Sequence, residues 1–217
     1  MREHKNISIA DQIFEQLERE ILSGKYPRNT VLSELGLSKE LGVSRTPVRE
    51  AIRRLEQEDI LEECGKGMVV VGITPEDMQD MFEIRLRVEG EVARRAAVNI
   101  NDEQLRSMRE ILDLQRFYSE KGGENSSDQI KNMDSQFHEL FYRASESRPF
   151  IRTLLPLHKR MMKLRKASVS KHSRAMQSLE EHEAIYEALL AHDPDAAEAA
   201  TLTHTWNARE RMTNLGE

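Results

Sequence analysis

Four side chains in the C-terminal part of the 217-residue sequence are of the types that bind divalent metal ions. Asp134 and His138 stand four residues apart, so on a helix they share a face and can hold one ion together. His182 and His204 can add imidazoles from two later helices, as in other helical bundles. This set has no thiolate and suits zinc or nickel, with manganese or iron as alternatives. Seven histidines in one chain will also place a few on helix faces by chance.

A second group of chemically active side chains is a cluster of arginines near the N-terminus. The chain has a net charge of −6, yet the segment from Ser44 to Arg54 holds four arginines against Glu50 alone. At about 100° per residue, one face of a helix here carries Arg45, Thr46, Arg49 and Arg53. Guanidinium groups pair with guanine in the major groove or bind phosphates, and Ser44 at the helix start can add a hydroxyl contact. The alternative is an ordinary solvated basic helix.

The elements around this segment favour DNA binding. Ser8 with Asp11 is a typical helix start, and the apolar spacing continues until Gly24. A short second helix begins at Ser33, and Gly42 then provides a tight turn before the arginine-bearing helix. This order predicts a helix-turn-helix.

A hairpin is predicted directly after the third helix. Ile60–Leu61 and Met68–Val71 are apolar β-runs, joined by a glycine-bearing tip at residues 64–67. Lys66 and Gly67 of this tip are candidates for contact with the DNA backbone. Residues 1–72 are therefore predicted to form a winged helix-turn-helix DNA-binding domain.

The remaining residues, 73–217, show helical patterns and no convincing strand. Thr74-Pro75-Glu-Asp is a strong helix start, with a cap, a proline at the first position and acids in the first turn. The sequence predicts a mainly α protein whose second domain is an antiparallel all-α bundle of about six helices. The predicted helices are 75–97, 102–121, 128–145, 149–168, 173–191 and 194–214.

Two arginines of this bundle lie on apolar helix faces. Arg85 and Glu89 interrupt the apolar stripe of the first helix, where the simplest interpretation is an i,i+4 ion pair. Arg165 lies on the stripe formed by Leu154 and Met161. Charges on such faces need partners inside the bundle.

Composition excludes several classes of protein. No apolar run approaches the roughly 18 residues that a membrane span needs, and acidic residues interrupt the first 25 residues, unlike a secretory signal. The single cysteine, Cys64, suits a reducing compartment. The sequence predicts a cytoplasmic protein without a membrane partner.

The segment Leu41-Gly-Val-Ser-Arg-Thr-Pro-Val-Arg-Glu-Ala-Ile-Arg-Arg-Leu55 resembles the signature of GntR-type regulators. The resemblance extends through Leu32-Ser-Glu34 and the wing. It implies that Arg45 and Arg49 contact operator DNA. Some relatives carry a further DNA-contacting arginine where this chain has Leu35, so that contact is not expected.

Residues of the second domain resemble the effector domain of the FadR branch, called FCD. The matching motifs are Asp134-x-x-x-His138, Glu181-His182-Glu-Ala-Ile185 and His204 after Asp193-Pro-Asp-Ala-Ala197. The resemblance implies one metal held by the Asp and three His, with a small carboxylate effector held by the metal and an arginine. Arg85 is then the expected carboxylate clamp and Arg165 a second candidate, whereas His158 matches no metal position.

The sequence therefore predicts a ligand-responsive transcriptional regulator and not an enzyme. We expect a repressor of a metabolic operon that binds a palindromic operator in double-stranded DNA; the family resemblance implies a homodimer. One alternative is a metallohydrolase in which the Asp/His cluster activates water, although a free enzyme has no need of a winged helix-turn-helix. Another is a constitutive DNA-binding protein whose bundle only dimerises.

Overall fold

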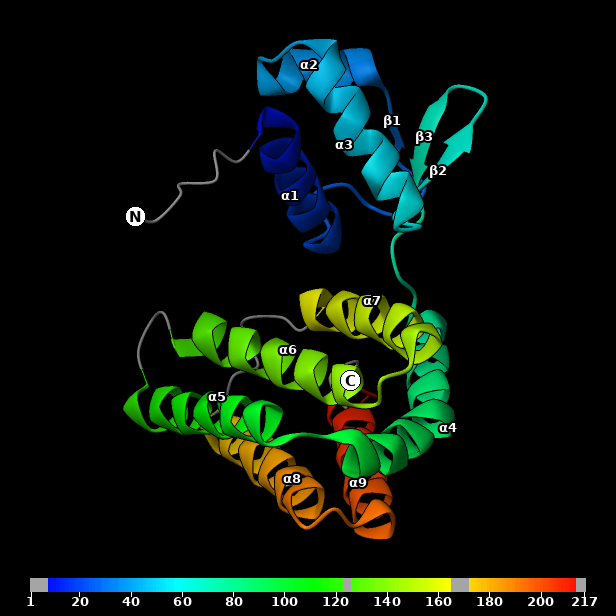
Figure 1. Cartoon of the computed structure of the whole chain (residues 1–217). Coiled ribbons are helices and arrows are strands. Elements are labelled where there is room, and N and C mark those ends of the chain that lie inside the picture. The colour runs from blue at the N-terminus through cyan, green and yellow to red at the C-terminus, as the bar shows by residue number, and fades with distance from the viewer. Residues whose placement is uncertain (1–7, 123–125, 165–171, 214–217) are drawn as a thin grey trace. The chain divides into compact units, whose positions relative to one another are not determined.

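The protein folds into two compact units, one ending at Thr74 and the other beginning at Pro75. The computed structural model describes residues 8–122, 126–164 and 172–213. A small sheet accompanies three helices in the first unit, and the described part of the second unit is helical (Figure 1). The mainly α fold predicted from the sequence is confirmed. Among the described helices, none has the length and apolar character needed to cross a membrane.

The N-terminal unit has the predicted helix-turn-helix and wing. Ser8 and Asp11 form a reciprocal capping box at the first helix, and the Ser33 hydroxyl accepts from the Gly36 amide at the second. Gly42 ends the second helix with a left-handed φ of 67°. The elements are α1 (Ile9–Leu22), β1 (Val31–Leu32), α2 (Glu34–Leu41), α3 (Arg45–Gln57), β2 (Leu61–Cys64) and β3 (Gly67–Val70).

The sheet has one more strand than the sequence predicted. The short β1 pairs antiparallel with β3, so the strand order is β1-β3-β2. Gly67 opens β3 with a φ of 144°, and a Cβ atom there would lie 2.5 Å from the Leu32 carbonyl oxygen. Only glycine fits at this position, because any side chain would push β1 away from the wing.

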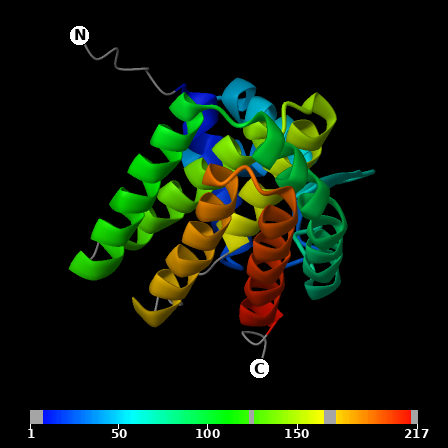
Figure 2. The same cartoon turned by 60° about the horizontal axis from the view of Figure 1, so that its bottom comes forward.

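The C-terminal unit contains six described helices. They are α4 (Pro75–Asn99), α5 (Asp102–Lys121), α6 (Ser126–Ala144), α7 (Arg148–Leu164), α8 (His172–Leu190) and α9 (Pro194–Thr213). Figure 2 shows α5, α8 and α9 side by side, and α9 packs along α4. Helix α6 contacts α4, α5 and α7, and its Phe137, Phe141 and Tyr142 are fully buried. Side chains on the inner face of α6 therefore lie in the middle of the bundle.

The close approach of β1 to the wing can be tested with two glycines of the hairpin. Gly67→Ala should lower the free energy of unfolding of the N-terminal unit by about 1–3 kcal/mol, because it adds backbone strain and an overlap with the Leu32 carbonyl. Gly65→Ala is the matched control, since a Cβ atom there meets nothing within 4 Å. Urea unfolding measures both, and equal losses would contradict the proposed contact.

Candidate DNA interface and candidate metal centre

Helix α3 presents its polar face to solvent. Val48, Ala51 and Leu55 are completely buried against the rest of the N-terminal unit. The predicted DNA-contacting residues of this helix and its cap are all exposed: Ser44, Arg45, Thr46, Arg49 and Arg53. Ser44 occupies the N-cap position, but its hydroxyl makes no capping hydrogen bond within residues 8–122. That hydroxyl and the first amides of α3 can therefore face an anion.

Glu34, the first residue of α2, holds two of these arginines. Its carboxylate accepts two hydrogen bonds from Arg49, at 2.8 and 3.0 Å, and one of 3.0 Å from Arg45. The hydrogen bond from Arg49 is the main reason that the pKa of Glu34 falls to about 2. The guanidinium groups are thus positioned on the surface by a neighbouring helix. These two contacts were not predicted from the sequence. They join Glu34 to arginines that follow it by 11 and 15 positions.

Arg54 has a different environment from the other arginines of α3. It pairs with Asp11 of α1, and its guanidinium lies 4.0 Å from the centre of the Phe14 ring. Arg54 therefore fixes α3 on α1. The exposed arginines of α3 are Arg45 and Arg49, which share Glu34, and Arg53. Lys66 is exposed at the tip of the wing.

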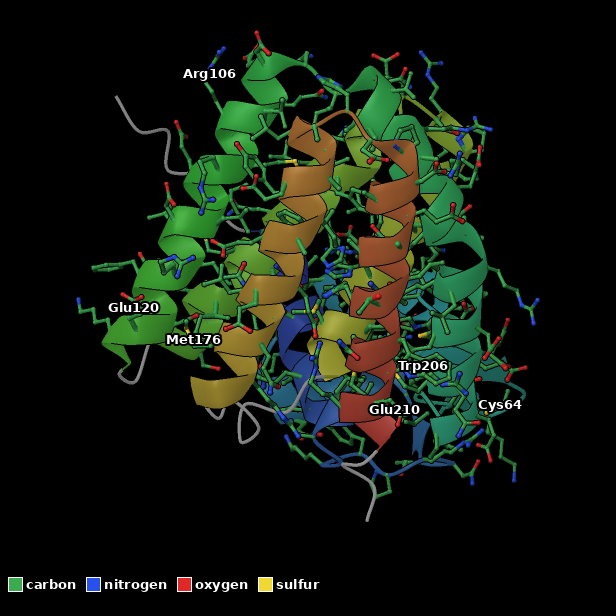
Figure 3. The ribbon with its side chains drawn as sticks, turned by 90° about the horizontal axis from the view of Figure 1, so that it is seen from below. Cys64, Arg106, Glu120, Met176, Trp206 and Glu210 are labelled. Carbon is green, nitrogen blue, oxygen red and sulfur yellow. The ribbon has the colours of Figure 1, made fainter. Side chains whose placement is uncertain are left out.

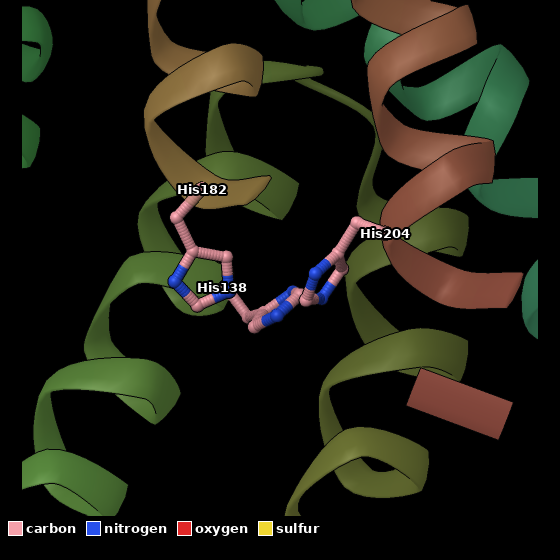
Figure 4. A group of neighbouring side chains, drawn as sticks. All are labelled: His138, His182 and His204. Carbon is pink, nitrogen blue, oxygen red and sulfur yellow. The ribbon is translucent and has the colours of Figure 1, made fainter. Parts of the chain in front are cut away.

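Three histidines from three helices meet in the middle of the C-terminal unit. His138 of α6, His182 of α8 and His204 of α9 each offer a ring nitrogen within 4.8 Å of the others (Figure 4). Asp134 lies one turn before His138, and its carboxylate is 4.0 Å from the His182 Nε2 atom. None of the four is more than 3% exposed. The structure therefore brings together all four residues that the sequence proposed as metal ligands.

Outer hydrogen bonds orient two of these imidazoles. The His204 Nδ1 atom lies 2.9 Å from a Glu181 carboxylate oxygen, which can only accept, so this nitrogen carries the proton. His182 Nδ1 likewise lies 3.1 Å from the Gln115 amide oxygen. In both rings the lone pair is then on Nε2. Arg211 binds Glu181 with two hydrogen bonds of 2.7 Å and fixes it in place.

The charge state of the histidines also suits metal binding. Burial lowers the pKa of His138 well below its ordinary value and lowers that of His182 to about 3. Both rings are therefore neutral at physiological pH, the form that binds metals. His138 Nδ1 and His182 Nε2 are buried without a hydrogen-bond partner among the described residues. Neutral imidazoles with unpaired nitrogens beside a carboxylate fit a borderline divalent ion.

His158 of α7 belongs to the same cluster. Its ring centre is 4.1 Å from that of His138, and its Nε2 atom is 3.3 Å from an Asp134 carboxylate oxygen. With Asp134 and His138 it offers a second group of potential ligand atoms within 4.8 Å of one another. The family resemblance gave His158 no role. Its spacing did contain a signal, because His158 shares a helical face with Leu154 and Met161, which are buried.

Arg85 and Glu89 form a buried ion pair next to this cluster. Arg85 donates to Glu89 from Nε and Nη2, at 2.7 and 3.1 Å, as the i,i+4 interpretation predicted. Burial alone would raise the pKa of Glu89, but the Arg85 charge and hydrogen bonds from Thr205 and Tyr142 hold it below its usual range. The Nη1 group of Arg85 is the donor that Glu89 does not use. Arg165, the second effector candidate, lies outside the described residues.

A small cavity of about 20 Å³ adjoins the cluster. Its lining includes Arg85, Asp134, His138, His158 and His204, together with methionines of α7 and α9. This volume holds a metal ion or about one water molecule.

Comparison with known proteins agrees with both parts of the fold. Residues 9–70 match the family of bacterial regulatory proteins called gntR, and residues 80–206 match the FCD domain. The chain belongs to the GntR family of transcriptional regulators. Members of this family bind operator DNA, and FCD domains often bind a metal.

Relatives of this GntR regulator include full-length homologues. It is 28% identical to the uncharacterized HTH-type transcriptional regulator YdhC of Bacillus subtilis, over 95% of this chain and 92% of the relative. It is also 28% identical to the HTH-type transcriptional repressor RspR of Escherichia coli, over 95% and 90%. The solved structure of E. coli McbR/YncC shares the fold, with a TM-score of 0.74, 20% identity and coverage of 97% and 100%. The relatives are regulators, so the metallohydrolase alternative has no support among them.

The buried ion pair of this regulator gives a stability prediction. Glu89→Gln leaves the Arg85 charge uncompensated inside the bundle, so the free energy of unfolding should fall by about 3–5 kcal/mol. Glu91→Gln removes the partner of Arg95 in a half-exposed i,i+4 pair of the same helix and should cost at most about 1 kcal/mol. Chemical unfolding measures both variants. Similar losses of unfolding free energy in the two variants would mean that the buried Arg85–Glu89 pair stabilises the fold no more than an exposed pair does.

Proposed function

We propose that this protein is a homodimeric repressor that senses a small carboxylate through a metal ion in its FCD domain. The observation that carries the proposal is the buried group of Asp134 and three histidines beside a cavity that also meets Arg85. The same chain exposes arginines on a recognition helix. One chain thus combines a DNA-reading surface with a site suited to a metal and an anion.

DNA recognition depends on the exposed face of α3. We infer that Arg45 and Arg49 contact bases or phosphates in the major groove, and that Ser44, Thr46 and Arg53 support them. Glu34 holds Arg49 through two parallel hydrogen bonds, which limits the freedom of the guanidinium before DNA arrives. Lys66 and Gly67 of the wing lie at the hairpin tip and supply contacts to the backbone.

The metal is held by Asp134, His138, His182 and His204 in this proposal. Zinc or nickel suits the donors best, with manganese or iron as alternatives. When bound, the ion supplies positive charge and open coordination positions for a carboxylate. Glu181 and Gln115 keep two of the imidazoles oriented, as outer partners do in other metal sites.

The effector site requires movement of the cavity wall. Arg85 supplies the charge opposite the carboxylate, and its Nη1 group is not engaged by Glu89. Met161 and Met212 line the cavity, and methionine side chains change shape at low cost. Effector binding therefore widens the cavity and shifts the population between two arrangements of the FCD domain.

Dimerisation gives each operator two recognition helices. A two-fold symmetric dimer reads two related half-sites, so we expect a palindromic operator. A small acid is a typical metabolite, so we expect the regulated genes to form a metabolic operon. The protein would act on this operon in the cytoplasm.

The DNA contact can be tested by Arg49→Ala. We expect its affinity for a site selected from random DNA by the wild type to fall by about 1–3 kcal/mol, because one guanidinium contact is lost. A binding titration at one fixed salt concentration measures the change.

The matched control for this experiment is Arg106→Ala, which removes an equal charge from an exposed position on α5 (Figure 3). Its affinity should equal that of the wild type. Equal affinities for the wild type and Arg49→Ala would exclude Arg49 from the interface.

The metal centre can be tested by His182→Ala. The purified wild type should contain about one metal ion per chain, and the variant clearly less, because one of four ligands is lost. Elemental analysis of untagged protein gives both values and identifies the metal.

His192→Asn is the matched control for metal content. The His192 ring contacts the Ala97 carbonyl outside the cluster, and asparagine tolerates its positive φ of 49°. Full metal content is expected in this variant. A metal-free wild type, or full retention in His182→Ala, would contradict the proposed ligand set.

A further inference from the structure

His158 is the one member of the buried cluster that the family motifs do not explain. It is 2% exposed and comes from α7, whereas the other ligand candidates come from α6, α8 and α9. It therefore approaches the cluster from a separate helix. His158 lies on the buried face of α7, because it follows the buried Leu154 by one helical turn.

Both ring nitrogens of His158 lack a hydrogen bond of normal geometry in the described part of the chain. Buried polar atoms are nearly always paired, and an unpaired imidazole in a bundle core is costly. The nearest polar group is the Asp134 carboxylate, at 3.3 Å. The His138 ring packs against His158 with a centre distance of 4.1 Å and an interplanar angle of 34°. Asp134 and His138, two ligand candidates, are thus direct neighbours of His158.

We propose that His158 is a fifth protein ligand of the metal, in addition to Asp134, His138, His182 and His204. This inference rests on the proposed metal site. Asp134 and His138 belong to both groups of potential ligand atoms, one completed by His158 and the other by His182 and His204. The Asp134 carboxylate is 3.3 Å from His158 Nε2 and 4.0 Å from His182 Nε2, so an ion bound by Asp134 lies within reach of imidazoles from both groups.

A fifth ligand has a consequence for effector binding. Nickel, manganese and iron accept five or six ligands, and zinc accepts five. With His158 bound, fewer coordination positions would remain for a carboxylate.

The alternative is that His158 only orients Asp134. Metal affinity alone does not separate the two roles, because loss of an outer partner also weakens binding by about 10–100-fold. The geometry of the bound metal does separate them, since only the loss of a ligand changes the donor set. Cobalt(II) reports that geometry through its visible absorption, which depends on the number and type of its ligands.

The experiment uses full-length, untagged protein that has been stripped of metal and titrated with cobalt(II). In His158→Ala we expect one cobalt per chain, a dissociation constant raised by about tenfold or more, and a changed absorption spectrum. Free imidazole should restore the wild-type spectrum, because it fits the space that the side chain leaves. His192→Asn should show the wild-type spectrum throughout.

Each further outcome is decisive. A His158→Ala spectrum identical to that of the wild type and unaffected by imidazole would overturn the fifth-ligand role, even if binding weakened. Absence of cobalt binding by the wild type would overturn the metal site itself and this inference with it. If His158→Ala does not fold, His158→Gln replaces it: glutamine keeps an N–H donor for Asp134 but no imidazole, and an unchanged cobalt spectrum would again overturn the role.

Discussion

The burial of ionisable side chains in the FCD domain is the constraint on which the C-terminal unit depends. Water does not reach Glu89 or His182, so each polar atom there must find a partner or remain costly. The Glu89 carboxylate has three partners, Arg85, Tyr142 and Thr205. These residues come from α4, α6 and α9, so one buried carboxylate ties three helices together.

The hydrogen bonds of the buried histidines also explain where the FCD domain has a potential ligand site. His182 and His204 each have one nitrogen paired and directed outward, to Gln115 and Glu181. The unpaired nitrogens then point into the centre of the bundle. Among the described residues, buried ring nitrogens of His138, His158 and His182 without a hydrogen-bond partner lie together here, which is the physical pattern expected of a ligand site.

Features that depend on residues close in the sequence were predicted better than contacts between different helices. The caps at Ser8 and Ser33 and the turn at Gly42 follow from neighbouring residues, and all three are confirmed. The pair of Arg85 and Glu89 followed from an i,i+4 spacing. By contrast, the contact of Glu34 with Arg49 and that of His158 with Asp134 depend on how two helices pack, which the order of residues along one helix does not specify. His158 was therefore missed although its position on an apolar face was visible.

Helix α4 provides the covalent route between the two functions. It starts at Pro75, shortly after β3 ends at Val70, and its residues Phe82 and Arg85 line the cavity. Under the proposed function, a ligand in this cavity contacts side chains of α4 as well as methionines of α7 and α9. Coupling between the two sites then requires that the ligand bind one arrangement of α4 better than another, since a ligand with equal affinity for both shifts nothing.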